Sequence, residues 1–445
     1  MSPAIDRLPP GPRWPAAAVR FAMKHRPLRL FEHGFARYGD VVRYEAPPLR
    51  YVVVARPDAV EHVLLRSYRQ YDKAVRHPVM MRLMGEGVIM TNGDRWRQQR
   101  KALAPAFQPR QLSRLVDGIV ETTNEAVEDW RRRDTQEVDV HAELGALTRR
   151  VVGRTLFGLR GGETAELGEA LDELVVRANL RGDRFWNLGL RYPTPRNRRF
   201  FRAIELVDRF VGGLIQERRQ GGGGDDVLTA LMHAHEDSGL AQLDDTELRD
   251  EILNLFFAGF ETSASALTWT FLQLSRYPAA VRGIAQEVDR VVGDAPLRFE
   301  HLTALEYTGR VLDETMRLYP PIWTNERVAG EDDEIGGYHI PKGTMVAVST
   351  WLLHRNPRLW EHPQRFDPER FLPERSKERS RYAFVPFGVG PRTCVGNHFA
   401  TMQAKVMLAT VVRRLAIDIP LTVPRPTAAI TLRPAGPLPG RLRAL

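Results

Sequence analysis

Apolar residues recur every three or four positions through most of this chain, the spacing that places them on one face of an α-helix. The pattern predicts helices over 121–133, 141–157, 162–180, 197–219, 244–275, 278–292, 304–318 and 397–414. Segment 244–275 is apolar nearly all round, which is typical of a buried helix. Asp244 or Asp245 can cap its start, with Glu247 as the reciprocal acid of a capping box. We therefore predict a helical protein built around one long central helix.

Short β-branched runs lie towards the two ends of the chain. Residues 41–44 and 51–55 predict a hairpin, and 333–340 and 345–348 predict strands joined by a turn at 341–343. Residues 355–391 have no period, and long irregular segments usually serve a function. The predicted fold class is mainly α with a minor β-rich region, in a single domain over 1–445. About 1–60, 325–350 and the C-terminal tail would form the small sheets, and about 93–318 and 397–414 the helical core.

The composition is that of a folded protein, with 43% hydrophobic and 27% charged residues. Lys and Arg number 64 against 55 Asp and Glu, a formal charge of +9. This excess could attract nucleic acid, an anionic membrane surface or an acidic protein partner, and the charge alone does not choose among them. The absence of a basic, aromatic-interleaved motif argues against nucleic acid. We find neither the apolar core of a leader peptide nor the run of ~18 apolar residues that a membrane span needs. The sequence predicts a cytoplasmic protein without a transmembrane anchor.

The single cysteine, Cys394, lies in the most informative segment. One cysteine excludes an internal disulfide, a zinc finger and a CxxC redox centre. Residues 387–396 read Phe-Gly-Val-Gly-Pro-Arg-Thr-Cys-Val-Gly, which predicts a tight loop directly before a helix. A cysteine at the start of a helix is held as thiolate by the dipole. A thiolate is the ligand with which some haem enzymes promote O–O cleavage. The alternative is an inert buried cysteine.

This segment resembles the haem-binding loop of the cytochrome P450 superfamily, Phe-x-x-Gly-x-Arg-x-Cys-x-Gly. The fixed positions are occupied by Phe387, Gly390, Arg392, Cys394 and Gly396. The resemblance implies a P450 fold whose long central helix lies over haem b. It further implies that Cys394 is the iron ligand, that Phe387 packs beside the sulfur, and that Arg392 pairs with a haem propionate.

Other family motifs follow in the expected order. Glu314 and Arg317 match the Glu-x-x-Arg pair, which the resemblance joins to Arg370 of the Pro-Glu-Arg-Phe segment as a structural triad. Trp96 and Arg100 match the Trp-x-x-x-Arg helix and, like Arg327, would bind the propionates. Taken alone, Trp96 and Arg100 fit an anchored helix with a solvated arginine equally well. His354, at a predicted strand end, is either a further contact or a surface histidine.

The predicted central helix carries Ala258-Gly259-Phe260-Glu261-Thr262, which resembles the family's oxygen-activating motif. A glycine costs about 1 kcal/mol inside a helix, and close approach of a cofactor to Ala258 and Gly259 would explain it. The resemblance gives Glu261 and Thr262 the role of an acid–alcohol pair that delivers protons during oxygen activation. The alternative is a threonine bonded to its own helix and a glutamate that faces water.

The family layout implies a largely apolar substrate pocket, although core packing explains each of its members equally well. Its candidates are Met80, Met84, Val88, Leu255, Phe256, Ile322, Trp323 and Leu432. The implied enzyme is a monooxygenase that inserts one atom of O2 into a hydrophobic small molecule such as a terpenoid, fatty acid or polyketide. Alternatives are an H2O2-driven peroxygenase and a non-catalytic haem- or ligand-binding protein.

No electron-transfer domain follows residue 445, so we expect electrons from NAD(P)H to arrive through a separate ferredoxin or flavodoxin and its reductase. In the family layout two basic groups would face that acidic partner. They are Arg95, Arg97, Arg100 and Lys101 in the first group, and Lys405, Arg413 and Arg414 in the second. A solvated basic surface is the alternative reading of each residue.

Overall fold

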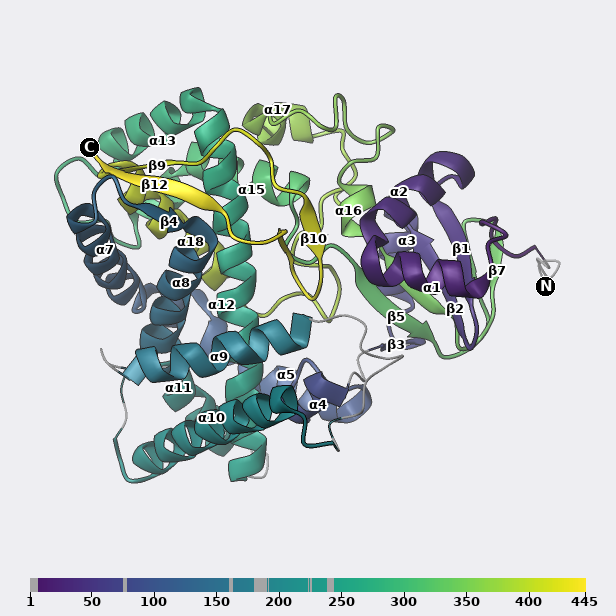
Figure 1. Cartoon of the computed structure of the whole chain (residues 1–445), viewed down its shortest axis with the longest axis horizontal. Coiled ribbons are helices and arrows are strands. Elements are labelled where there is room, and N and C mark those ends of the chain that lie inside the picture. Colours follow the sequence, from purple (N-terminus) through teal and green to yellow (C-terminus); the bar gives the residue numbers. More distant parts are fainter. Residues whose placement is uncertain are drawn as a thin grey trace. The chain divides into compact units, whose positions relative to one another are not determined.

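Figure 1 shows a computed structural model of the chain. The structure describes residues 7–74, 78–159, 163–179, 190, 192–222, 224, 226–237 and 244–445. The chain divides into two compact units, of which unit 1 comprises residues 1–75, 313–394 and 430–432, and unit 2 comprises 76–312, 395–429 and 433–445. The expectation of a single domain over 1–445 stays a prediction, and each unit is described by itself.

Unit 1 is built on a five-stranded sheet with the strand order β1-β2-β8-β5-β3. Its strands are β1 (Val41–Ala46), β2 (Leu49–Val54), β3 (Tyr71–Lys73), β5 (Asn325–Ala329) and β8 (Met345–Val348). β2 and β8 pair in parallel, and the other neighbours are antiparallel. The predicted β1–β2 hairpin is confirmed. β5 lies in the 325–350 region predicted to form sheet, but it was not predicted as a strand of its own, because polar and charged side chains occupy three of its positions and hide the apolar alternation.

Buried valines from β1, β2 and β8 form the core of this sheet, including Val41, Val52, Val54, Val346 and Val348. Two helices of the N-terminal segment lie beside β1 (Figure 1). The helices of unit 1 are α1 (Ala16–His25), α2 (Pro27–Tyr38), α3 (Pro57–Glu61), α16 (Thr350–Leu353) and α17 (Pro373–Ser376). A π-helical turn over His62–Arg66, a 3₁₀ turn over Pro368–Phe371 and the hairpin of β6 (Asp333–Ile335) and β7 (Tyr338–Ile340) complete it.

Unit 2 is helical, and the periodicity predicted most of its helices to within a few residues. They are α4 (Pro78–Met84), α5 (Gly93–Leu103), α6 (Pro109–Ser113), α7 (Val116–Arg132), α8 (Val140–Phe157), α9 (Glu163–Asn179), α10 (Pro195–Arg219), α11 (Val227–Asp237), α12 (Asp245–Arg276), α13 (Pro278–Val291), α14 (His301–Ala304) and α18 (Asn397–Val412). A 3₁₀ turn spans Ala104–Phe107, and α15 (Glu306–Leu318) contains the boundary between the units. Residues 162 and 180 of one predicted helix lie outside the described residues.

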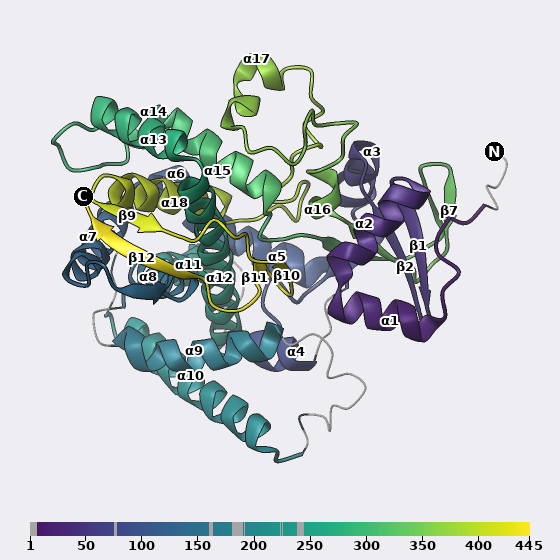
Figure 2. The ribbon, with the colours of Figure 1, turned by 45° about the horizontal axis from the view of Figure 1, so that its top comes forward.

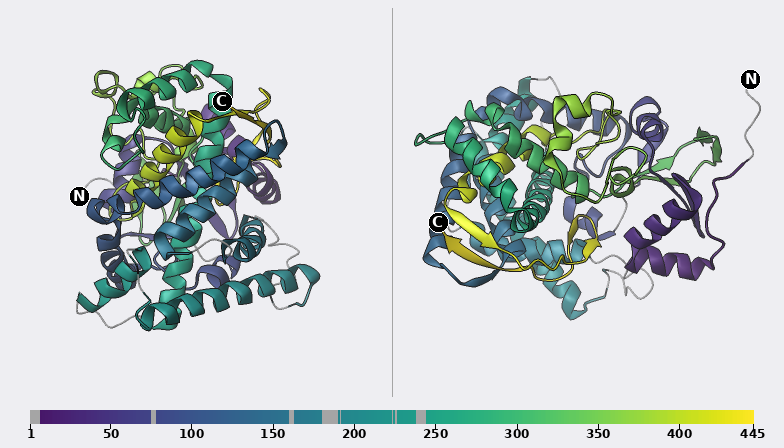
Figure 3. Two further views of the ribbon diagram at one scale, coloured as in Figure 1. Left: turned by 90° about the vertical axis from the view of Figure 1, so that its left-hand side faces the viewer. Right: turned by 90° about the horizontal axis from the view of Figure 1, so that it is seen from above.

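The long α12 is the predicted central helix. Asp244 accepts the Glu247 N–H at 2.8 Å while the Glu247 carboxylate accepts the Asp244 N–H at 3.2 Å, so the capping box is confirmed. Nearly every residue of α12 between Ile252 and Leu274 is buried. α8 and α10 pack on it (Figure 1), and the right-hand view of Figure 3 looks almost along its axis. Such burial explains why its sequence is apolar all round.

The C-terminal residues of unit 2 complete its core and its small sheets. α18 packs against α7 and α13 (Figure 2). The β-rich tail predicted from residue 420 onward is confirmed as β10 (Pro426–Ala428), β11 (Leu432–Pro434, whose first residue belongs to unit 1) and β12 (Pro439–Ala444). β9 (Leu415–Asp418), which lies before that tail, and β4 (Glu137–Asp139) pair with β12. Within the described part of the chain, no helix has the length and apolar character needed to cross a membrane.

Candidate cofactor site

The loop before α18 is as tight as its glycines predict. Gly388 and Gly390 have φ angles of +71° and +77°, which only glycine adopts without strain. A Cβ atom on Gly390 would lie 2.2 Å from the Leu64 carbonyl oxygen, so any side chain there would collide with the π-helical turn. The Cys394 N–H donates to the Phe387 carbonyl at 3.0 Å and closes the loop. This fold leaves the Cys394 side chain exposed, which disagrees with the alternative of a buried cysteine.

Three cations of unit 1 influence one another near this loop. Lys73 and Arg327 face each other in the β3–β5 pairing, and Arg392 lies two residues before Cys394. Burial, followed by the charges of Arg327 and Arg392, lowers the pKa of Lys73 to about 7. Burial and the charge of Arg392 lower the pKa of Arg327 to about 10, and burial lowers the pKa of Arg392 to about 10 although Asp72 opposes this shift. An anion bound here would stabilise all three cations.

These residues fit haem b, because an exposed thiol can ligate iron, and the buried Arg327 with the half-buried Lys73 and Arg392 can hold propionate carboxylates. Arg327 and Arg392 were candidates from the sequence, and Lys73 was not. A lone lysine in a three-residue strand carries no motif. Only the strand register, which sets Lys73 opposite Arg327, places it in this cluster.

His354 lies elsewhere than predicted. It follows α16 instead of ending a strand, and it is fully buried. Its Nε2 accepts the Val385 N–H at 2.9 Å, and its ring lies 5.1 Å from that of Phe384, centroid to centroid. Burial, aided by the charge of Arg317, lowers its pKa to about 3. The prediction of a surface histidine is therefore wrong, and its bonded Nε2 joins the irregular segment to α16.

In unit 2, Trp96 and Arg100 lie one turn apart on α5, as the motif predicts. Trp96 is buried and Arg100 is half-buried. Gly396 precedes α18, where a Cβ atom would lie 3.7 Å from the Phe107 ring. All three stay candidates for the cofactor site.

The Ala258–Thr262 motif lies in the interior of α12. A Cβ atom on Gly259 would lie 3.3 Å from the Val152 side chain of α8, so close helix packing gives this glycine a reason of its own. The Thr262 hydroxyl donates to the Ala258 carbonyl at 2.7 Å. Glu261 is buried rather than facing water. Its carboxylate influences two titratable groups of neighbouring helices. Burial lowers the pKa of His141, and the charge of Glu261 opposes this shift. Burial raises the pKa of Asp172, and the charge of Glu261 raises it as well.

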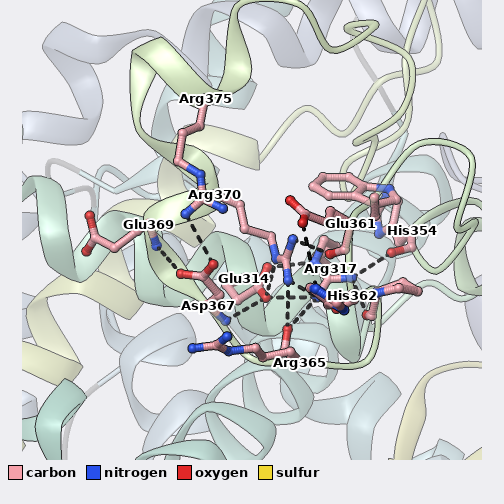
Figure 4. A network of polar contacts seen from close by, with 12 residues as sticks. Glu314, Arg317, His354, Glu361, His362, Arg365, Asp367, Glu369, Arg370 and Arg375 are labelled. Carbon is pink, nitrogen blue, oxygen red and sulfur yellow. Dashed lines mark hydrogen bonds and ion pairs between the residues drawn. The ribbon is translucent and has the colours of Figure 1, made fainter.

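A buried carboxylate holds two arginines in the polar network of Figure 4. Arg317 donates to both Glu314 oxygens at 2.6 and 2.8 Å, and Arg370 donates to Glu314 Oε1 at 3.1 Å. The guanidinium of Arg317 also binds the carbonyls of His354, Pro363 and Arg365, and that of Arg370 those of Glu361, His362 and Arg365. The network therefore satisfies carbonyl groups of residues 361–365 and ties this part of the irregular 355–391 segment to α15, the structural role that the resemblance implied.

The substrate-pocket candidates have different surroundings. Met80, Met84, Val88 and Leu255 are buried in unit 2, and Ile322 is half-buried in unit 1. Three others show contacts of core residues. Phe256 stacks on Phe157 of α8 with 5.5 Å between ring centroids, Trp323 lies 5.6 Å from Phe31 by the same measure, and the buried Leu432 donates its N–H to the Pro321 carbonyl.

Comparisons with known proteins identify the family. The sequence matches the family "Cytochrome P450" over residues 9–437. It is 34% identical over 428 residues to a cyclooctat-9-en-7-ol 5-monooxygenase of Streptomyces melanosporofaciens, covering 93% of this chain and 92% of the relative. A pentalenene oxygenase of Streptomyces avermitilis is 31% identical over 424 residues, covering 94% and 93%. The solved heme domain of cytochrome P450DA superposes with a TM-score of 0.88 at 26% identity, covering 98% of both chains. The chain therefore belongs to the cytochrome P450 family of haem b-dependent monooxygenases.

Proposed function

We propose that this monooxygenase hydroxylates or epoxidises a cyclic terpenoid, with electrons supplied by a separate redox protein. Two relatives that span more than nine tenths of the chain are named as oxygenases of cyclooctat-9-en-7-ol and of pentalenene, both terpenoids. A third similar protein is named cyclooctatin synthase. The buried methionines of α4, Met80 and Met84, suit a pocket for an apolar polycyclic molecule, because methionine adapts its shape to irregular surfaces. The proposal of a terpenoid substrate rests on the names of these relatives together with the apolar methionines of α4.

We infer the residue roles from the family motifs, and the surroundings described above support them. When haem b binds, Cys394 would supply the thiolate that ligates its iron, and Arg327 and Arg392, joined by Lys73, would hold its propionates. Trp96 and Arg100 add donors from α5. Haem, when bound, supplies the oxygen-activating chemistry. Ala258 and Gly259 border the cofactor.

Glu261 and Thr262 hold and move the protons that oxygen activation consumes. The Thr262 hydroxyl is both donor and acceptor, so its bond to Ala258 leaves its oxygen able to accept a hydrogen bond from a neighbouring proton donor. The buried Glu261 is close to His141 and Asp172, whose titration can resupply it.

The first experiment is the absorption spectrum of the dithionite-reduced protein under carbon monoxide. We expect the long-wavelength Soret band of a thiolate-ligated ferrous carbonyl, and its loss in Cys394→Ser. A histidine-type band in the unmodified protein would overturn the Cys394 assignment.

In turnover with a ferredoxin and its reductase, Thr262→Ala is expected to keep its haem and to divert electrons from NADPH to the reduction of O2 to hydrogen peroxide. Full coupling in that variant would remove Thr262 from proton delivery.

The second experiment tests the substrate class with a panel of pentalenene, lauric acid and a macrolide aglycone. We expect a low- to high-spin shift and a mono-oxygenated product from the terpenoid only. A shift with lauric acid alone would overturn the terpenoid assignment. Equal or faster turnover with hydrogen peroxide in place of NADPH and redox partners would favour the peroxygenase alternative, and spin shifts without product would favour a non-catalytic binding protein.

A further inference from the structure

The segment between α4 and α5, residues 85–91, is bound to α12 through its backbone. The Glu86 N–H donates to Asp250 Oδ2 at 2.7 Å, the Val88 N–H to Glu251 Oε2 at 3.2 Å, and the Ile89 N–H to Asn254 Oδ1 at 3.0 Å. The acceptors lie within two turns of α12. Because the backbone amides of the segment donate these bonds, they fix the path of the segment independently of its side chains.

The fit of this segment on α12 is close. Asn254 Nδ2 donates to the Met84 carbonyl at 2.7 Å. A Cβ atom on Gly85 would lie 2.0 Å from the Asp250 carboxylate, and one on Gly87 would lie 2.2 Å from Asn254 Nδ2. On its other side the segment is joined to α5, because Gln99 donates to the Glu86 carbonyl at 2.7 Å. The two glycines are thus required by the approach of the segment to α12.

Glu251 differs from the other two acceptors. It is 2% exposed, and its Oε1 is buried with no hydrogen-bonding partner among the residues that the structure describes. Asp250 has a second donor, since Arg249 binds it at 2.8 Å. Glu251 thus keeps a carboxylate out of water with a single long hydrogen bond, which costs free energy when the group is charged.

The surrounding charges add to this cost. Burial, aided by the charges of Asp250 and Glu247 and only partly offset by the Val88 N–H, raises the pKa of Glu251 to about 7. Arg95 of α5 opposes them, but it is 2.6 Å from Glu86 and 3.6 Å from Glu247 and is shared between those acids. These are the charged groups of α12, α5 and the segment that face Glu251. The carboxyl is poised to change its charge near neutral pH.

We propose that Glu251 is a positioning residue whose protonation holds the 85–91 segment on α12 and whose ionisation loosens it, so that access of substrate past Met84 and Val88 changes with pH. The part that concerns substrate rests on the proposed function. A neutral carboxyl still accepts the Val88 N–H through one oxygen and leaves no buried charge. An ionised one gains solvation when the segment moves away from α12.

The sign follows from linkage. With the segment bound, the pKa of Glu251 is about 7, and a solvated glutamate has the ordinary value of 4.5. Binding of the segment is therefore strongest below about pH 4.5 and weakens as the pH rises, down to a limit reached above pH 7. Between pH 6 and pH 8 the binding equilibrium is expected to fall about tenfold.

Amide hydrogen exchange of the holoenzyme tests the contact without any substrate. We expect the protection factors of residues 86–89 to fall about tenfold from pH 6 to pH 8, and to stay high and constant in Glu251→Gln. Asp245→Asn, an exposed acid in the first turn of the same helix, is the matched control and should behave like the unmodified protein. The same pH response in Glu251→Gln, or none in the unmodified protein, would overturn the proposal.

Association of tert-butyl isocyanide with the reduced holoenzyme tests access, because this haem ligand is neutral at every pH used. The association rate should rise between pH 6 and pH 8 in the unmodified protein and stay constant in Glu251→Gln. A pH response in exchange without one in the isocyanide rate would overturn the control of access and count against Met84 and Val88 as pocket residues. Neither readout depends on the terpenoid assignment, so the two proposals fail separately.

Discussion

At the scale of single residues, chemistry that depends on a motif was readable from the sequence, and chemistry that depends on register was not. Cys394 is recognisable because fixed residues surround it, and the structure gives it an exposed side chain. Lys73 has no such neighbours, and its place opposite Arg327 comes from strand pairing between segments far apart in the chain. Gly259 shows a further limit: the sequence suggested a cofactor as its reason, and the structure adds the close approach of Val152.

Replacing Lys73 is expected to stabilise the protein without haem and to weaken haem binding. Replacing it in Lys73→Met removes a half-buried cation that Arg327 and Arg392 repel, so the protein without haem should unfold at a higher urea concentration. With haem bound, loss of a partner of the propionates should speed haem transfer to apomyoglobin about tenfold or more. Lys342→Met, in an exposed turn of the same unit, is the control and should change neither. Unfolding at a higher urea concentration together with an unchanged rate of haem transfer would show that Lys73 does not contact the propionates.

At the scale of elements, periodicity predicts helices well because their burial depends on local spacing, as in α12 with its capping box. The irregular 355–391 segment could not be predicted, because its backbone is satisfied by distant side chains. Arg317 and Arg370 donate hydrogen bonds to carbonyl groups of residues 354–365, and one carboxylate, Glu314, lies between them. The sequence showed the three residues that take part, but not the carbonyl groups that they bind.

Glu314→Gln tests how far this network stabilises unit 1. The change keeps the shape of the side chain but leaves two buried guanidiniums without their shared anion. Removing one partner of a buried ion pair costs about 3–5 kcal/mol, so we expect a loss of that size in the free energy of unfolding measured with urea. Glu374→Gln, an exposed acid on α17, should lose less than about 0.5 kcal/mol. Equal stability of the two variants would show that the carbonyl groups alone hold the arginines.

At the scale of the whole molecule, the net charge of +9 is compatible with an acidic partner but identifies neither the partner nor the residues that it meets. The structure shows that many of the basic candidates are already paired. Arg97 binds Asp94, Arg413 binds Asp289 at 3.1 Å, and Arg414 binds Glu128. Lys405 donates to the Leu302 carbonyl at 2.9 Å. Lys101, by contrast, is exposed and has no hydrogen bond or ion pair within the described ranges. A count of charges could not separate these cases: Arg97 pairs within its own helix, whereas the partners of Arg413 and Arg414 lie on other helices and depend on how the helices pack.

The structure therefore predicts that Lys101 contributes more than Arg97 to docking of the redox partner, although the sequence analysis placed both in the same group. Asp94 offsets the charge of Arg97, whereas that of Lys101 acts on an approaching partner in full. In stopped-flow reduction by a [2Fe-2S] ferredoxin at low salt, Lys101→Gln should lower the second-order rate several-fold and reduce its dependence on ionic strength. Arg97→Gln should change the rate less. Lys377→Gln, an exposed lysine outside the predicted docking groups, serves as the control for net charge. If all three variants slow reduction equally, net charge rather than a docking face governs the encounter, since long-range attraction depends on the total charge when no specific contact forms.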